Sequence, residues 1–399
     1  RSARPSQRRP RWIVIAALVT VAANLRLLIA SLPPLTASIR SDLGLDARAI
    51  GALTMIPVLC MGVLAPLSSR IGRRLGIAHA IGGGVTLVLL GTALRGLGGV
   101  HTWSLYAGTL TAGVGIALTG TLLPGLVKGF FPPERWGLGT GLTMFAMMGG
   151  AAIAAASSVP LASALGGWPA SLLVWAAPSS VAVLLWVPIT SGIAQHTLAA
   201  PAPQDVSHAL PWRSGTALLM AAYLTAQSWQ FYSSLAWLAP TYVAHGWDAD
   251  YAGRLLSVFT GAQLLSGLIA PALMDRVRDH RLLLLAACSL GLVGQLGIWL
   301  APASAPWAWA GVLGAGQGAA FALGLGLLVR YAATPRDSAR LTALAFLVSY
   351  SLAALGPVTM GAVRDATGGY SAIWGVLCVV MLPQIVLAWR LRPGLAPVT

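Results

Sequence analysis

The sequence predicts an all-α membrane protein with twelve transmembrane helices in two pseudo-symmetric six-helix bundles. Three observations lead to this class: composition, the length of the apolar runs and an internal repeat. Of 399 residues, 57% are hydrophobic and only 9% are charged, whereas soluble proteins carry about 25% charged residues. Apolar runs long enough to cross a bilayer, about 20 residues each, recur along nearly the whole chain.

Short loops separate the apolar runs, with one exception near residues 190–212. That segment is rich in Ala, Pro and His, which is typical of a flexible linker. We therefore expect an N-terminal bundle over 1–189, a cytoplasmic linker over 190–212 and a C-terminal bundle over 213–399. The predicted spans lie near residues 12–34, 47–67, 77–97, 103–127, 136–160, 168–189, 213–240, 251–273, 281–301, 306–329, 340–362 and 371–391.

The distribution of Lys and Arg predicts the orientation. If the N-terminus is cytoplasmic, nineteen of the 25 basic residues fall on the inside, five fall on the outside (Arg95 among them), and Arg26 is left within a span. Cytoplasmic loops carry this excess in membrane proteins, so we expect both termini in the cytoplasm. The basic start could flank a signal peptide, but the run that follows contains Arg26 and exceeds a typical signal core, which favours a retained first span.

The two halves of the chain resemble each other. The basic segment 67–74 after the second span recurs as 273–280 after the eighth, at an offset of 206 residues. The same offset carries Pro34 onto Pro240 and Arg26 onto Tyr232. Two six-helix halves related by an axis along the membrane normal imply a transporter whose site lies at the midplane between them. Arg26 and Tyr232 should then face each other, unless the similarity is chance in apolar sequence.

The basic segment resembles the Asp-Arg-x-Gly-Arg-Arg signature of the major facilitator superfamily, with Ser69 in place of its Asp and Asp275 retaining it in the second copy. Four stretches resemble the cyanate and 2-nitroimidazole transporter (CynX/NimT) branch. They are Asn24-Leu25-Arg26, the Pro124-Gly125-Leu126-Val127-Lys128 run with Phe131-Pro132, residues 227–240, and 350–357. The resemblance covers the whole chain and implies transport of small solutes, often anionic or azole-like. Phe346 departs from the branch, where we expect a Gln.

Arg26 is the residue around which the predicted site is built. An arginine near the centre of a spanning helix costs about 2.5–3.5 kcal/mol on insertion scales. It can snorkel to an interface or be held by backbone carbonyls. Alternatively, it is a fixed positive charge for an anionic or strongly polar ligand. All ten acidic residues fall in loops or at predicted helix ends, so no protein carboxylate should neutralise it, and proton coupling through a buried acid is disfavoured.

Few other polar side chains fall at depth, and each has a structural alternative. An amide can bridge neighbouring helices, and an aromatic residue can anchor a span at the interface. We expect the substrate-binding residues to be Arg26, Asn24, Gln227, Trp229, Tyr232, Gln263, Gln317 and Tyr350. We expect the gating loops on the cytoplasmic side to contain Arg70, Arg73, Arg74, Lys128, Asp275, Arg276 and Arg330.

Other classes of function lack a signal in the sequence. The net charge of +15 is dispersed over short loops without interleaved aromatics, which argues against nucleic acid. Cys60, Cys288 and Cys378 have no metal-ligand spacing, and we find no catalytic motif, so we expect no enzyme, no cofactor and no metal. We expect a monomeric secondary active transporter in the bacterial cytoplasmic membrane, moving a small anionic or polar organic solute by alternating access. An exporter of neutral or cationic drug-like compounds and a non-transporting ligand sensor remain alternatives.

Overall fold

The computed structural model describes residues 11–131, 136–192, 210–274, 276–277, 279–333 and 335–398. Within these ranges the regular structure is helical, and an isolated bridge joins Ala332 to Val398. The first half of the chain contains α1 (Arg11–Ala30), η1 (Pro33–Leu35), α2 (Thr36–Leu43), α3 (Ala47–Val63), α4 (Ala65–Leu75), α5 (Ile77–Arg95), α6 (Thr102–Phe130), α7 (Trp136–Ala164), α8 (Trp168–Val174) and α9 (Ala176–Gly192). The second half contains α10 (Gly215–Ala244), α11 (Ala249–Met274), α12 (His280–Leu300), α13 (Pro306–Arg330), α14 (Pro335–Ala353), α15 (Leu355–Thr367) and α16 (Ser371–Arg390).

Each of the twelve predicted spans overlaps a helix or a pair of consecutive helices. By length and composition, ten helical segments of the described chain can cross a membrane, and the bent pair α3–α4 makes an eleventh. The remaining predicted span is α10, which is long enough but too polar for that test. Protein surrounds α10 along most of its length, with 21 of its residues buried. Its polar side chains can therefore lie against protein and need not face lipid.

Helix α1 ends earlier than the apolar run that predicted it. Pro33 and Pro34 lack the N–H that would continue the helix, and the chain passes into the short turn η1 and then α2. Arg26 therefore lies in the last third of α1, closer to its end than the sequence suggested.

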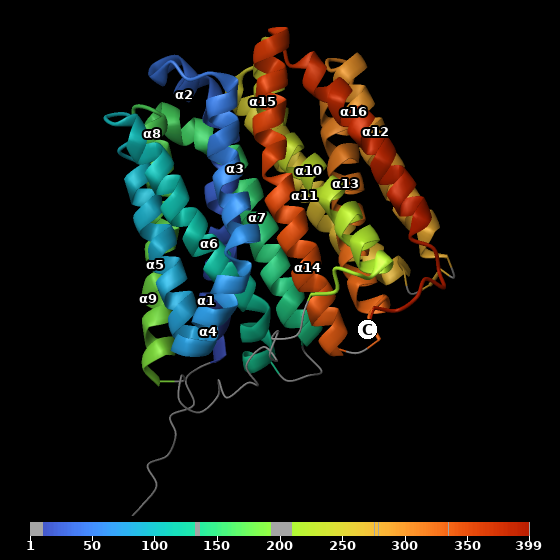
Figure 1. Cartoon of the computed structure of the whole chain (residues 1–399). Coiled ribbons are helices and arrows are strands. Elements are labelled where there is room, and N and C mark those ends of the chain that lie inside the picture. Colours follow the sequence, from blue (N-terminus) through green and yellow to red (C-terminus); the bar gives the residue numbers. More distant parts are fainter. Residues whose placement is uncertain are drawn as a thin grey trace, which may run out of the picture.

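The two halves lie side by side, with α1–α9 on one side and α10–α16 on the other (Figure 1). Helix α2 and the turn between α15 and α16 lie at the upper end of the view, and α4 lies at the lower end. We refer to these as the α2 end and the α4 end. The predicted linker falls mainly on residues 193–209, outside the described residues.

Contacts between the halves concentrate at the α2 end. The Asp365 carboxylate of α15 accepts hydrogen bonds from the backbone N–H groups of Ala47 (3.2 Å) and Arg48 (2.9 Å) at the start of α3. Arg40 of α2 donates to the Tyr370 hydroxyl at 3.1 Å. Gly361 leaves no room for a side chain, because an added Cβ would lie 2.5 Å from the Ala47 carbonyl oxygen. The α2 end is thus closed by backbone-to-backbone packing and by a carboxylate that caps a helix of the opposite half.

The buried apolar side chains form a different pattern at each end. One large cluster joins residues of both halves, from Ala17 to Leu377. A second cluster draws only on the second half, between Ala217 and Val398, and lies where α10, α12 and α14 begin and α11, α13 and α16 end. The halves therefore share a core toward the α2 end, and the second half has its own core toward the α4 end.

Arg95 corrects one detail of the orientation argument. The sequence counted it among the outside basic residues, near the end of the span predicted at 77–97, but it is the last residue of α5 and is 2% exposed. Its burial means that it is no topology signal.

The capping carboxylate gives a first prediction. Replacing Asp365 with Ala removes two hydrogen bonds between the halves. Double electron–electron resonance between spin labels at the exposed positions 41 and 366 should then give a longer mean distance. The control is Asp46→Ala, which removes the cap that α3 receives from its own half through Ala49 N–H and should cost about 0.5–2 kcal/mol of stability without lengthening that distance. Equal distances in both variants and the parent would contradict the assigned role.

Candidate functional site

Arg26 lies between the two halves, against aromatic residues of α10. Its side chain is 8% exposed. The guanidinium carbon lies 5.4 Å from the ring centre of Phe231 and 5.8 Å from that of Tyr232. The predicted pairing of Arg26 with Tyr232 across the pseudo-symmetric halves is therefore seen directly.

Among the described residues, the guanidinium of Arg26 has aromatic neighbours but no hydrogen-bond acceptor. No hydrogen bond or ion pair reaches it from the described residues, and its buried Nη1 is without a partner. An aromatic face near a desolvated cation contributes about 2 kcal/mol, which offsets part of the cost of burying the charge. The in-plane N–H groups still need acceptors, because an arginine carries five donors and no acceptor of its own.

The rings next to Arg26 continue into an aromatic cluster between α10, α11 and α14. Tyr232 packs edge-on against Phe231 at 4.9 Å and against Tyr350 at 6.3 Å between ring centres. Phe346 lies 5.2 Å from Tyr350, and Phe259 of α11 stacks on Phe231 at 6.0 Å. The buried Tyr232 hydroxyl has no hydrogen-bond partner in the described part of the chain. The Gln expected at position 346 is thus replaced by a ring that extends the cluster.

A layer of amides lies one helical turn from the aromatic cluster, toward the α4 end. Gln227 precedes Phe231 by four residues on α10, and Gln263 follows Phe259 by four on α11, a spacing that places each pair on one helix face. Gln227 Nε2 donates to the backbone oxygen (3.2 Å) and side-chain oxygen (3.3 Å) of Gln317 on α13. Gln263 Oε1 and Gln317 Nε2 are buried without hydrogen-bond partners among the described residues, which leaves one acceptor and one donor open.

Two of the predicted binding residues lie away from this group. The Asn24 amide donates to the Pro178 carbonyl at 3.2 Å and accepts from the Ser179 hydroxyl at 2.6 Å, so it joins α1 to α9. Trp229 lines an apolar groove of about 490 Å³ between α10, α14 and α16, together with Val348 and Val380. The sequence alone does not show where these two side chains point, because a helix that is apolar on all sides has no polar face that reveals its direction.

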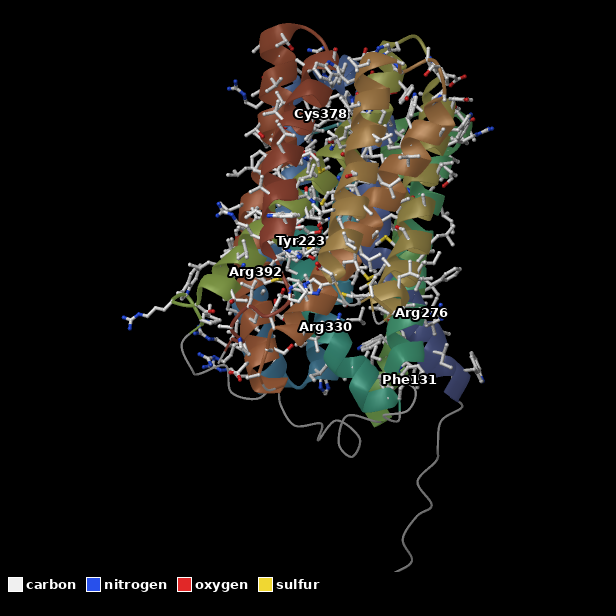
Figure 2. The ribbon with its side chains drawn as sticks, turned by 90° about the vertical axis from the view of Figure 1, so that its right-hand side faces the viewer. Phe131, Tyr223, Arg276, Arg330, Cys378 and Arg392 are labelled. Carbon is white, nitrogen blue, oxygen red and sulfur yellow. The ribbon has the colours of Figure 1, made fainter. Side chains whose placement is uncertain are left out.

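The basic residues predicted to flank the gate lie near the α4 end where their side chains are described. Arg70, Arg74 and Arg276 are exposed. Arg330 donates to the Met274 carbonyl at the end of α11 at 3.4 Å, and Figure 2 shows Arg276 and Arg330 in the lower part of the molecule, far from Cys378. The side chains of Arg73 and Lys128 and the whole of Asp275 lie outside the described residues.

The sequence missed Phe231, Phe259 and Phe346 as parts of the cluster. The available signal was position: Phe231 adjoins Tyr232, and Phe346 precedes Tyr350 by one turn. Within the described residues no group of His, Cys, Asp and Glu could hold a metal ion. Cys60, Cys288 and Cys378 are buried free thiols.

The comparisons with known proteins agree with one another on the family that this chain resembles. Residues 12–357 match the family described as Major Facilitator Superfamily. The chain is 33% identical to the 2-nitroimidazole transporter of Escherichia coli (94% of each chain covered) and 31% identical to the cyanate transport protein CynX of the same organism (94% and 96%). It is 32% identical to the uncharacterized transporter YycB of Bacillus subtilis (94% and 91%).

Solved structures share the fold at lower sequence identity. A D-xylose–proton symporter superposes with a TM-score of 0.73 at 14% identity, covering 97% of this chain and 98% of that one. A bacterial homologue of the lysosomal transporter Spinster, in an inward-facing conformation, gives 0.70 at 15% identity, with 98% and 96% covered. These likenesses concern the fold alone.

The unpartnered hydroxyl of Tyr232 gives a second prediction. Tyr232→Phe should leave the thermal stability of the purified protein unchanged or slightly raised, because a buried hydroxyl without a partner contributes no hydrogen bond. The matched change Tyr223→Phe removes a bond of 3.0 Å to the Ala320 carbonyl and should cost about 1 kcal/mol. Thermal unfolding of both variants measures the difference, and an equal loss in both would show that the Tyr232 hydroxyl already has a protein partner.

Proposed function

The chain belongs to the Major Facilitator Superfamily and is a secondary transporter of the membrane, and we propose that it moves a small anionic or polar organic solute with Arg26 as the central binding charge. The observation that carries this proposal is the buried guanidinium of Arg26, which has two aromatic faces beside it and no hydrogen-bond acceptor among the described residues. A solute with a negative charge, or with strongly accepting oxygens or nitrogens, supplies the hydrogen-bond acceptors that Arg26 lacks among the described residues.

The surroundings of Arg26 favour a small, flat solute. The Tyr232 ring lies beside the guanidinium and carries a hydroxyl without a partner among the described residues, and Tyr350 packs against that ring. Rings bind planar groups through their faces and edges. The two Escherichia coli relatives are named for 2-nitroimidazole and for cyanate, both small and planar or linear, which agrees with this environment. We therefore place azole-like compounds and small anions first among the candidates.

The amide layer extends the proposed binding region toward the α4 end. Gln263 Oε1 is an acceptor and Gln317 Nε2 is a donor, and neither has a hydrogen-bond partner among the described residues. A solute leaving Arg26 in that direction would meet neutral hydrogen-bonding groups in place of a second charge. Such groups bind it weakly enough to release it, because hydrogen bonds between neutral groups are about half as strong as charge-assisted ones.

We propose the membrane orientation from charge. The exposed basic residues near the α4 end, Arg70, Arg74, Arg276 and Arg330, assign that end to the cytoplasm by the positive-inside rule, and with it both termini. The α2 end, where the halves share backbone packing, then faces outward. The six-plus-six division at residues 190–212 and a location in the bacterial inner membrane complete the proposal, with a monomer as the working unit.

The third prediction tests the role of Arg26 in transport. In proteoliposomes, counterflow of cyanate, 2-nitroimidazole and small carboxylates should identify a transported probe, and Arg26→Ala should weaken its binding by about ten- to a hundredfold, the loss expected for hydrogen bonds to a charged group. Arg26→Lys keeps the charge but loses the planar fork and should be intermediate.

The control for this series is Arg254→Ala, which removes an exposed arginine paired with Asp250 on the surface and should leave counterflow unchanged. Full transport by both Arg26 variants would sink the proposal. Inhibition by neutral or cationic lipophilic compounds but not by anions would favour a drug exporter in which Arg26 is structural. Binding without counterflow would favour a ligand sensor.

A further inference from the structure

A second buried arginine, Arg95, contacts the end of the helix that carries Arg26. Its Nη1 donates to the backbone oxygen of Leu28 at 2.9 Å, two residues after Arg26 on α1. Arg95 is 2% exposed, and in the described chain no carboxylate pairs with it. Its charge must therefore be balanced by something other than an acid.

The end of α1 explains part of that balance. The last carbonyl groups of a helix have no helical donor, and Pro33 and Pro34 remove two more N–H groups just beyond. The Ser31 hydroxyl and Arg95 both donate to the Leu28 oxygen. Because the carboxyl end of a helix is partly negative, it stabilises a nearby cation, so Arg95 serves as a cationic cap supplied by α5.

Arg95 also lines a small cavity. Its Nε is buried and has no hydrogen-bond partner among the described residues. The cavity has a volume of about 10 Å³, and its other walls include Thr54 and Pro57 of α3 and Thr109 of α6. That volume is about the space that one water molecule needs.

The polar groups around the cavity select water over an anion. The Thr54 hydroxyl donates to the Gly51 oxygen at 2.9 Å and the Thr109 hydroxyl to the Leu105 oxygen at 2.7 Å, so each offers the cavity only lone pairs. Pro57 also deprives the Leu53 carbonyl of its usual helical donor. A water molecule can accept from Arg95 and donate twice, whereas a halide would meet oxygen lone pairs.

We propose that one buried water bridges Arg95 Nε to the hydroxyls of Thr54 and Thr109, and that this arginine and its water form a pin joining α1, α3, α5 and α6. The pin fixes the last turn of α1 and thereby positions Arg26. Arg95 is a positioning residue in this account, since Leu28 lies between it and the site. The positioning role rests on the proposed function, whereas the water site does not.

The water is tested by a structure of the full chain in lipid at a resolution that shows ordered water. The parent protein and Thr86→Val, which changes an exposed threonine bonded within α5, should show density in the cavity. The double variant Thr54→Val/Thr109→Val should lack it. An empty cavity in the parent, density that survives in the double variant, or an anomalous signal after soaking in bromide would each overturn the assignment.

The positioning role is tested by counterflow of cyanate and 2-nitroimidazole. Arg95→Met should raise the half-saturating concentration of the transported probe about tenfold, the effect of losing a hydrogen bond from a charged group. In Arg95→Lys this concentration should lie between those of Arg95→Met and the parent protein. The double variant Thr54→Val/Thr109→Val should raise the half-saturating concentration by a smaller factor. This variant provides the test if Arg95→Met does not fold.

The control Arg254→Met should have no effect. A purely structural role would lower the yield and the maximal rate and leave the half-saturating concentration unchanged, and that outcome would overturn the positioning role. If the parent transports neither probe, the proposed substrate class fails while the density in the cavity still decides whether the pin exists.

Discussion

A guanidinium buried against two aromatic rings, with no hydrogen-bond acceptor for it among the described residues, is the constraint on which this structure depends. Ring faces stabilise the charge of Arg26 but cannot accept all its in-plane hydrogen bonds. The surrounding protein offers no carboxylate within the described ranges. Under the proposed function a solute completes this group, because a buried guanidinium without hydrogen-bond acceptors is the costly state.

The architecture around Arg26 divides its tasks between the two ends of the molecule. At the α2 end, Gly361 brings α15 against α3, and Asp365 caps a helix of the opposite half. Toward the α4 end, the second half packs around its own core, and the open amides Gln263 and Gln317 lie on that side of the aromatic cluster. Tight packing at the α2 end and open amides toward the α4 end are compatible with the alternating access proposed above.

The sequence predicted the helices and the central pair well, because both follow from long-range regularities. Apolar length predicts a span, and the offset of 206 residues placed Arg26 opposite Tyr232. Side-chain direction was less predictable. Asn24 bonds to α9, and Trp229 lines the apolar groove beside α14 and α16, since a helix that is apolar on all sides has no amphipathic pattern to orient its few polar residues. Arg95 was misplaced for a related reason: a basic residue at a helix end looks the same in sequence whether it faces solvent or caps another helix.

The most direct test of the central claim compares a carboxylate ligand with its uncharged amide isostere by calorimetry on purified protein. The parent protein should bind the carboxylate more tightly, and Arg26→Gln, which keeps a planar donor but removes the charge, should bind the two compounds equally. Equal binding by the parent, or a preference for the carboxylate that persists in Arg26→Gln, would contradict the claim that Arg26 awaits a negative partner.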